Sequence, residues 1–130
     1  MNKIFDIRYY LSKRLPEIPD SDRYGKLYFD DILRLERFVP RNPFITDECC
    51  LYAGEIYKGY CNISYRGKKV SVVRLLIHNY LVNIEIDDVV VYFCKNRGLC
   101  VNLNHMGIKD KPMDKKFEKI KLTREDLSTW

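Results

Sequence analysis

The feature that most constrains this chain is a cluster of cysteine and histidine residues in its second half. Five residues separate Cys94 from Cys100, and four more separate Cys100 from His105. Zinc accepts thiolate and imidazole together, and a structural zinc site needs a fourth protein ligand to exclude water. Cys49 or Cys50 is the natural fourth ligand. Cysteines are also often buried simply as core residues, but three ligand-type residues within twelve positions favour a metal.

The cysteine count and the overall composition favour one soluble intracellular domain. Five cysteines is an odd number, and clustered cysteines near a histidine indicate metal ligation before disulfides, which implies a reducing compartment. Cys61 and the unused member of the Cys49/Cys50 pair are predicted core thiols. The chain is 46% hydrophobic and 32% charged, as is typical of one globular domain. We expect no membrane span and no signal peptide, because no apolar run is long enough and Asp6 interrupts the start.

The positive charge of the chain lies mainly in its middle. The net charge is +5, and residues 49–111 carry nine basic and five acidic side chains, whereas residues 1–48 carry nine of each. This excess permits nucleic-acid binding, but it equally suits ordinary solubility. Lys, Ile, Asn and Tyr make up about a third of the chain, as in proteins of AT-rich genomes, so a viral protein, acting in the virion or the host cell interior, is one expectation.

The hydrophobic spacing predicts an α+β fold. Amphipathic helices are expected over residues 3–14 and 25–38, forming an N-terminal helical extension at 1–44. Residues 60–72 are typical of a β-hairpin with Gly67 in its turn, followed by a helix over 74–81 and a buried strand over 86–93. We expect Cys49 to arrive from a strand before the hairpin. Residues 112–130 resemble a basic tail with a short final helix.

Residues 45–111 resemble the zinc-bound homing endonucleases of the HNH, or His-Me finger, type. The matching segments are residues 49–54, 58–60, 66–68, 73–75 and 94–106. The resemblance implies a ββα-metal domain with a β-hairpin and a zinc knuckle, which follows the two N-terminal helices. It also implies one structural zinc ion and allows a homodimer. The implied zinc ligands are Cys49, Cys94, Cys100 and His105.

The chain departs from that family where the chemistry takes place. Tyr92 stands where the family has its general-base histidine, and a phenol with a reference pKa of about 10 is a poor base near neutral pH. Val73 replaces a second histidine. The magnesium-holding asparagine has no counterpart, although Asp110 or Asp114 is an alternative cation ligand. His78 is expected to be a surface or packing residue. These departures predict a protein without nuclease activity.

The sequence therefore leaves three hypotheses. The first is a catalytically inactive zinc module that binds nucleic acid, DNA rather than RNA, or that works within a nucleoprotein complex. The second is an active metal-dependent nuclease with rearranged catalytic groups, and the third is a protein-facing structural subunit of a large complex or virion. For the first hypothesis, the expected contacts are at the basic hairpin tip and on the helix that follows it: Arg66, Lys68, Lys69 and Arg74. A basic turn can also serve solubility alone.

Overall fold

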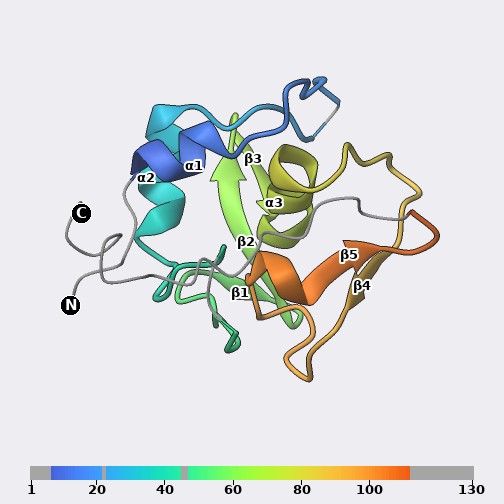
Figure 1. Ribbon diagram of the computed structural model, residues 1–130. Helices are drawn as coiled ribbons and strands as arrows, with labels where there is room; N and C mark the ends of the chain where they lie inside the picture. The colour runs from blue at the N-terminus through green and yellow to red at the C-terminus, as the bar shows by residue number, and fades with distance from the viewer. Residues whose placement is uncertain (1–6, 22, 45–46, 112–130) are drawn as a thin grey trace, which may run out of the picture.

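The computed structural model describes residues 7–21, 23–44 and 47–111, and these form the expected α+β fold. Two short helices, α1 and α2, lie side by side at one end, and the strands β4 and β5 lie at the opposite end (Figure 1). A three-stranded sheet and the helix α3 lie between them. In the part of the chain that is described, no helix is long and apolar enough to cross a membrane.

The N-terminal helices are shorter than the hydrophobic spacing predicts. α1 covers Ile7–Ser12, and residues 3–6 of the predicted helix lie outside the described residues. α2 covers Phe29–Glu36 instead of 25–38. Its start is set by Asp31, whose carboxylate accepts a hydrogen bond from the Tyr28 amide at 3.0 Å. Leu27 stays outside the helix because its amide donates to the buried Asn79 side chain at 2.8 Å.

An aromatic cluster and a buried amide join the N-terminal segment to the rest of the protein. The ring of Phe44 packs edge-on against Tyr10 of α1 and Tyr80 of α3, with centroids 5.0 and 5.1 Å apart. Asn79 accepts from Leu27 and donates to the Gly25 carbonyl at 2.9 Å. Buried polar groups need such partners, so α3 and residues 25–27 are held together by packing and by hydrogen bonds.

Two tight hairpins build the three-stranded antiparallel sheet, whose order is β1 (Ile56–Tyr57), β2 (Tyr60–Tyr65) and β3 (Lys68–Ser71). The predicted hairpin is confirmed, with Arg66 and Gly67 as its two-residue turn. Both turn residues have positive φ, as a type I′ turn requires. Lys58 and Gly59 repeat this conformation between β1 and β2. The first hairpin was not predicted, although its Lys-Gly pair resembles the Arg-Gly pair of the second.

The central helix α3 covers Val72–Tyr80 and packs against β2, β3 and β5. Ser71 caps it, because the serine hydroxyl accepts a hydrogen bond from the Arg74 amide at 3.2 Å. His78 is fully buried and has the packing role expected of it. Its Nε2 lies 2.7 Å from the Pro19 carbonyl and its Nδ1 accepts from the Ile84 amide at 3.1 Å. His78 therefore fixes two loops onto α3.

The predicted buried strand over residues 86–93 is wrong in extent and in burial. The observed strand β4 covers only Val90–Tyr92, is half-buried, and pairs with β5 (Met106–Ile108). A turn occupies the start of the predicted segment, because the Asp88 carboxylate accepts from the Glu85 amide at 2.7 Å. Ile86 consequently lies in solvent, with 92% of its surface exposed.

Candidate metal centre

Four side chains from two distant segments of the chain converge on one point. They are Cys49, Cys94, Cys100 and His105, and their ligand atoms all lie within 4.8 Å of one another. The structure thus brings together the full set of predicted metal ligands. Cys100 is buried and the other three are half-buried, so the centre lies just beneath the surface.

The spacing of the ligand atoms fits a tetrahedral ion. The Nδ1 atom of His105 lies 3.7 Å from the Cys49 sulfur and 3.6 Å from the Cys100 sulfur. An ion bound at about 2.3 Å to sulfur and about 2.0 Å to nitrogen separates such a pair by about 3.5 Å. Three thiols and one imidazole are moreover soft and borderline ligands, which suit a transition-type metal and not magnesium or calcium. These residues form a possible metal-binding site.

Cys49 reaches the centre on an extended segment, not on a strand as predicted. Its backbone pairs with the segment around Cys100 through an isolated bridge between Leu51 and Cys100. In this bridge the Val101 amide donates to the Cys50 carbonyl at 2.7 Å, and the Tyr52 amide donates to the Leu99 carbonyl at 3.0 Å. The buried Asn102 side chain adds a third hydrogen bond between the two segments, because its Nδ2 donates to the Glu48 carbonyl at 2.8 Å. Asn102 therefore holds Glu48, the residue before Cys49, across 54 positions of the sequence.

The other three ligands come from the segment between β4 and β5. Cys94 follows β4, and His105 ends a short 3₁₀ helix, η1 (Leu103–His105). Two hydrogen bonds close this segment: Phe93 donates to the His105 carbonyl at 2.8 Å, and Cys100 donates to the Asn96 carbonyl at 3.0 Å. Gly98 turns the chain between the cysteines with a φ of 81°, and an added Cβ would lie 2.5 Å from the Gly59 carbonyl oxygen.

Hydrogen bonds to sulfur prepare the thiols for a cation. The Asn96 side chain is the largest influence that lowers the pKa of Cys49, against the opposing effect of burial. Burial raises the pKa of the Cys100 thiol to about 12, and the amides of Asn102 and Cys50 act against that rise. The Cys50 amide lies 3.4 Å from the Cys100 sulfur. A bound metal cation would stabilise the buried thiolate, because metal ligation deprotonates cysteine.

The two remaining cysteines occupy core positions, as predicted. Cys50 is fully buried, and its thiol lies 3.5 Å from the Arg41 carbonyl. Cys61 is buried with its thiol 3.1 Å from the Gly98 carbonyl, and burial raises its pKa to about 12. Of the pair Cys49 and Cys50, between which the residues alone left the choice open, the structure places Cys49 in the cluster of possible ligands.

The predicted nucleic-acid residues are dispersed over two sites. Arg66, in the turn of the hairpin, pairs with Asp20 at 2.9 Å and lies over the Tyr65 ring. Lys69 pairs with Glu55 at 2.6 Å, and Lys68 is exposed. These acidic partners offset part of the positive charge of the tip. Arg74 lies away from the tip, and its guanidinium donates to the Asp88 carbonyl at 2.7 Å.

Arg74 lines a cavity of about 430 Å³ beside the segment between β4 and β5. Arg97, Tyr92 and Ser71 line the same cavity. Among the residues that the structure describes, no acidic side chain lines this cavity. Burial raises the pKa of Tyr92 to about 12, although Arg74 and Arg97 act to lower it. Tyr92 is therefore a neutral hydroxyl at pH 7. Arg97 was not predicted here, because only the fold of the segment between β4 and β5 places it in the same cavity as Arg74.

Of the two acids considered as cation ligands, Asp110 is exposed and has positive φ. Asp114 lies outside the described residues, as do the predicted C-terminal tail and its helix.

The sequence predictions also missed Asn96 and Asn102, which support the possible metal ligands. The sequence pattern that could have identified them is an asparagine two residues after each of Cys94 and Cys100.

Comparison with known proteins gives one distant relative. The chain is 30% identical over 135 residues to an uncharacterized protein of Acanthamoeba polyphaga mimivirus. The match covers 91% of this chain but only 38% of the relative's length. No protein-family model and no solved structure matches. The similarity to a viral protein points to the viral origin that the composition also suggested.

Proposed function

We propose that this chain is a catalytically inactive, zinc-stabilised module of the HNH-like, His-Me finger kind that binds nucleic acid. The observation that carries the proposal is the convergence of four protein ligand atoms within 4.8 Å. A catalytic zinc site keeps a position open for water or substrate, whereas four protein ligands close the coordination shell. The metal would therefore hold the fold together and take no part in a reaction.

Zinc is the metal that best suits this set of ligands. Three cysteines and one histidine are a common structural zinc set, and the sulfur to nitrogen separations of 3.6 and 3.7 Å fit tetrahedral coordination. The β2–β3 hairpin followed by α3, and the β4–β5 pair that brackets three of the ligands, support the HNH-like assignment.

The absence of nuclease activity is supported by the chemistry of Tyr92. A general base must accept a proton near neutral pH, but burial raises the pKa of Tyr92 to about 12. The phenol can donate a hydrogen bond in the cavity, and it cannot activate water efficiently. Arg74 and Arg97, which line the same cavity, are suited to holding a phosphate group.

We expect no cleavage of nucleic acid. Plasmid and single-stranded substrates should survive prolonged incubation with magnesium or manganese, as followed by gel electrophoresis. Tyr92→His should not restore cleavage, because the sequence also lacks the asparagine that would hold the catalytic metal. Metal-dependent cleavage by the native protein that disappears in Tyr92→Phe would instead favour the active-nuclease hypothesis.

Nucleic-acid binding is tested by a salt-dependent gel shift with the triple variant Arg66→Ala, Lys68→Ala and Lys69→Ala. Melting temperature should change little, because an exposed ion pair contributes up to about 1 kcal/mol. Affinity should fall, and the slope of log affinity against log salt should flatten by about two to three units, at about 0.7 to 0.9 per phosphate contact.

The matched control for this variant removes three exposed cations elsewhere, with Lys13→Ala, Arg23→Ala and Lys109→Ala. It loses the same net charge and should retain the steeper slope. If the two triple variants behave alike, the hairpin tip is not a contact, and general charge explains the binding. If the native protein shifts neither DNA nor RNA at low salt, the nucleic-acid proposal is rejected.

Exposed apolar residues favour a second candidate, a protein-facing structural subunit. Ile56 and Tyr57 form the short edge strand β1, and 44% and 60% of their surfaces are exposed. Tyr60 and Phe93 are also more than half exposed. Unpaired strand edges and exposed aromatic residues are common at protein interfaces. The gel shift separates the two candidates, since this one predicts no salt-dependent binding of nucleic acid.

A further inference from the structure

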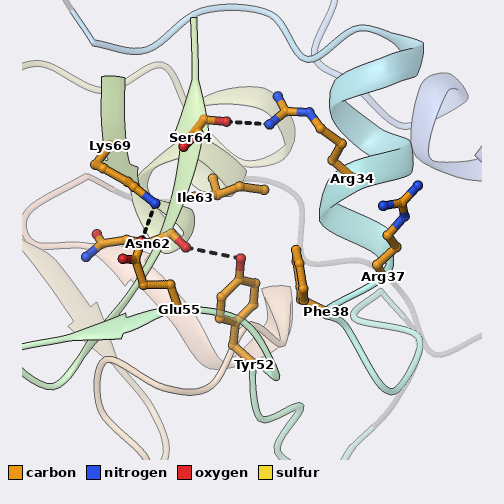
Figure 2. A pocket seen from close by; sticks show the side chains of 9 residues that line it. All are labelled: Arg34, Arg37, Phe38, Tyr52, Glu55, Asn62, Ile63, Ser64 and Lys69. Carbon is orange, nitrogen blue, oxygen red and sulfur yellow. Dashed lines mark hydrogen bonds and ion pairs between the residues drawn. The ribbon is translucent and has the colours of Figure 1, made fainter. Parts of the chain in front are cut away.

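A second cavity lies on a different part of the molecule, between the end of α2 and the β2–β3 hairpin (Figure 2). Its volume is about 290 Å³. That is near the lower limit of about 300 Å³ for small-molecule sites, so the cavity suits a ligand of roughly the size of one nucleotide. Neither the metal ligands nor Arg74 line it.

The floor of this cavity is apolar and partly aromatic. Ile63 of β2 faces Phe38 and Tyr52 across the open space (Figure 2). The two rings lie 5.8 Å apart and are tilted by 58°. The Tyr52 hydroxyl donates to the Asn62 carbonyl at 3.2 Å, which fixes that ring. These side chains give the cavity an apolar surface against which a flat group can pack.

Two arginines from one end of α2 border the helix side of the cavity. Arg34 is held in place, because its guanidinium donates to the Ser64 carbonyl at 2.8 Å and to Asp31 at 3.1 Å. Arg37 lies three positions further and is exposed. Its guanidinium has no hydrogen-bond partner among the described residues. Both arginines line the helix side of the cavity (Figure 2), and guanidinium groups are suited to the oxygens of a phosphate.

The opposite wall offers both a donor and an acceptor. Lys69 and Glu55 form an ion pair at 2.6 Å, and both side chains are largely exposed. The Glu55 carboxylate has further lone pairs for hydroxyl or amino groups, and the Lys69 ammonium has further protons. Among the described residues, the three cations and one carboxylate of the lining carry a net charge of +2, which complements a phosphate monoester.

We propose that this cavity binds a nucleotide. The phosphate would lie against Arg34 and Arg37, the base against Phe38 and Ile63, and the polar groups of the sugar or base near Glu55 and Lys69. The nucleotide can be free or part of a single strand. This inference deepens the proposed nucleic-acid function, on which it rests, by adding a second site on the α2 side of the hairpin.

The test is calorimetric titration of the full chain with uridine monophosphate, uridine and inorganic phosphate as probes. Uridine monophosphate should bind with a dissociation constant of about 1 mM or tighter, and uridine should bind at least about tenfold more weakly, because it lacks the phosphate that would accept charge-assisted hydrogen bonds from the arginines. Arg37→Ala should weaken uridine monophosphate binding by about tenfold or more, because a charge-assisted hydrogen bond is lost. Arg23→Ala removes an exposed arginine outside the cavity and should leave binding unchanged.

Competition by an oligothymidylate of about ten nucleotides distinguishes the two sources of the ligand. Displacement of uridine monophosphate by the oligomer identifies a nucleotide within a strand, and failure to displace it identifies a free nucleotide. Undetectable binding of uridine monophosphate, or equal losses in Arg37→Ala and Arg23→Ala, would overturn the inference. A gel shift that persists in Arg37→Ala leaves the proposed function standing, so the two failures are distinguishable.

Discussion

Removal of zinc by excess chelator is expected to unfold the protein. The proposed metal ligands come from the segment around Cys49 and from the segment between β4 and β5, which otherwise share few backbone hydrogen bonds. Structural zinc sites in small domains contribute about 10 kcal/mol or more of apparent binding free energy. A domain has only about 5 to 15 kcal/mol of total stability. Loss of the metal should therefore remove most of the cooperative stability of the fold.

The measurement is circular dichroism during thermal unfolding, before and after chelation, with a thiol reductant present so that the freed cysteines cannot form disulfides. The melting transition should shift by tens of degrees or disappear. Added zinc should restore it, whereas added magnesium should not. A chelated protein that keeps its melting temperature would show that the cysteines and His105 are held by the fold alone.

The second large effect is expected from Cys100→Ser compared with Cys61→Ser. Both thiols are 1% exposed, so the two substitutions place the same hydroxyl at equally buried positions. Cys100→Ser removes a metal ligand, and we expect a loss of several kcal/mol together with the loss of stoichiometric zinc. Cys61→Ser should cost about 1 to 2 kcal/mol, because the hydroxyl can still donate to the Gly98 carbonyl.

Chemical denaturation gives the unfolding free energies of both variants, and metal analysis gives their zinc content. Cys50→Ser serves as a further control, because Cys50 is adjacent to a ligand and is also fully buried. It should resemble Cys61→Ser and keep its zinc. Equal losses of stability and zinc in Cys61→Ser and Cys100→Ser would mean that the ligands are misassigned.

The features that could be predicted from the sequence are those encoded locally. The turn at Arg66 and Gly67 needs positive φ, and its flanking residues alternate, so the hairpin was predictable. The ligands Cys94, Cys100 and His105 lie close in sequence and indicate a metal by their types alone. The choice of Cys49 over Cys50 required the family resemblance, because two adjacent thiols carry the same chemical information.

The features that could not be predicted depend on contacts between distant residues. Asn79 draws Leu27 out of the predicted helix by a hydrogen bond across 52 positions. Asn102 similarly positions the segment that carries Cys49. The apolar residues at 86–93 were interpreted as a buried strand, yet a local turn at Asp88 leaves Ile86 in solvent. Hydrophobic periodicity gives no information about these long-range hydrogen bonds. It also does not show where a local turn replaces part of a strand.

Pairing of the tip cations also escaped prediction. Arg66 and Lys69 were counted as available charges, but Asp20 and Glu55 lie against them in the folded protein. Asp20 is 46 positions from Arg66, so charge patterning in the sequence could not reveal the pair. The fold instead places Arg74 and Arg97 together in a cavity that no acidic residue of the described chain lines. Under the proposed function, that cavity is a stronger candidate for a phosphate contact than the hairpin tip.

The most direct test of the account is the metal content of the purified chain, measured by native mass spectrometry and by elemental analysis of the same sample. One zinc ion per chain is predicted for the native protein, and none for the variants Cys49→Ser, Cys94→Ser and His105→Ala, which change the converging ligands. A protein that carries no zinc when purified under reducing conditions, and that takes up none when zinc is added, would contradict it.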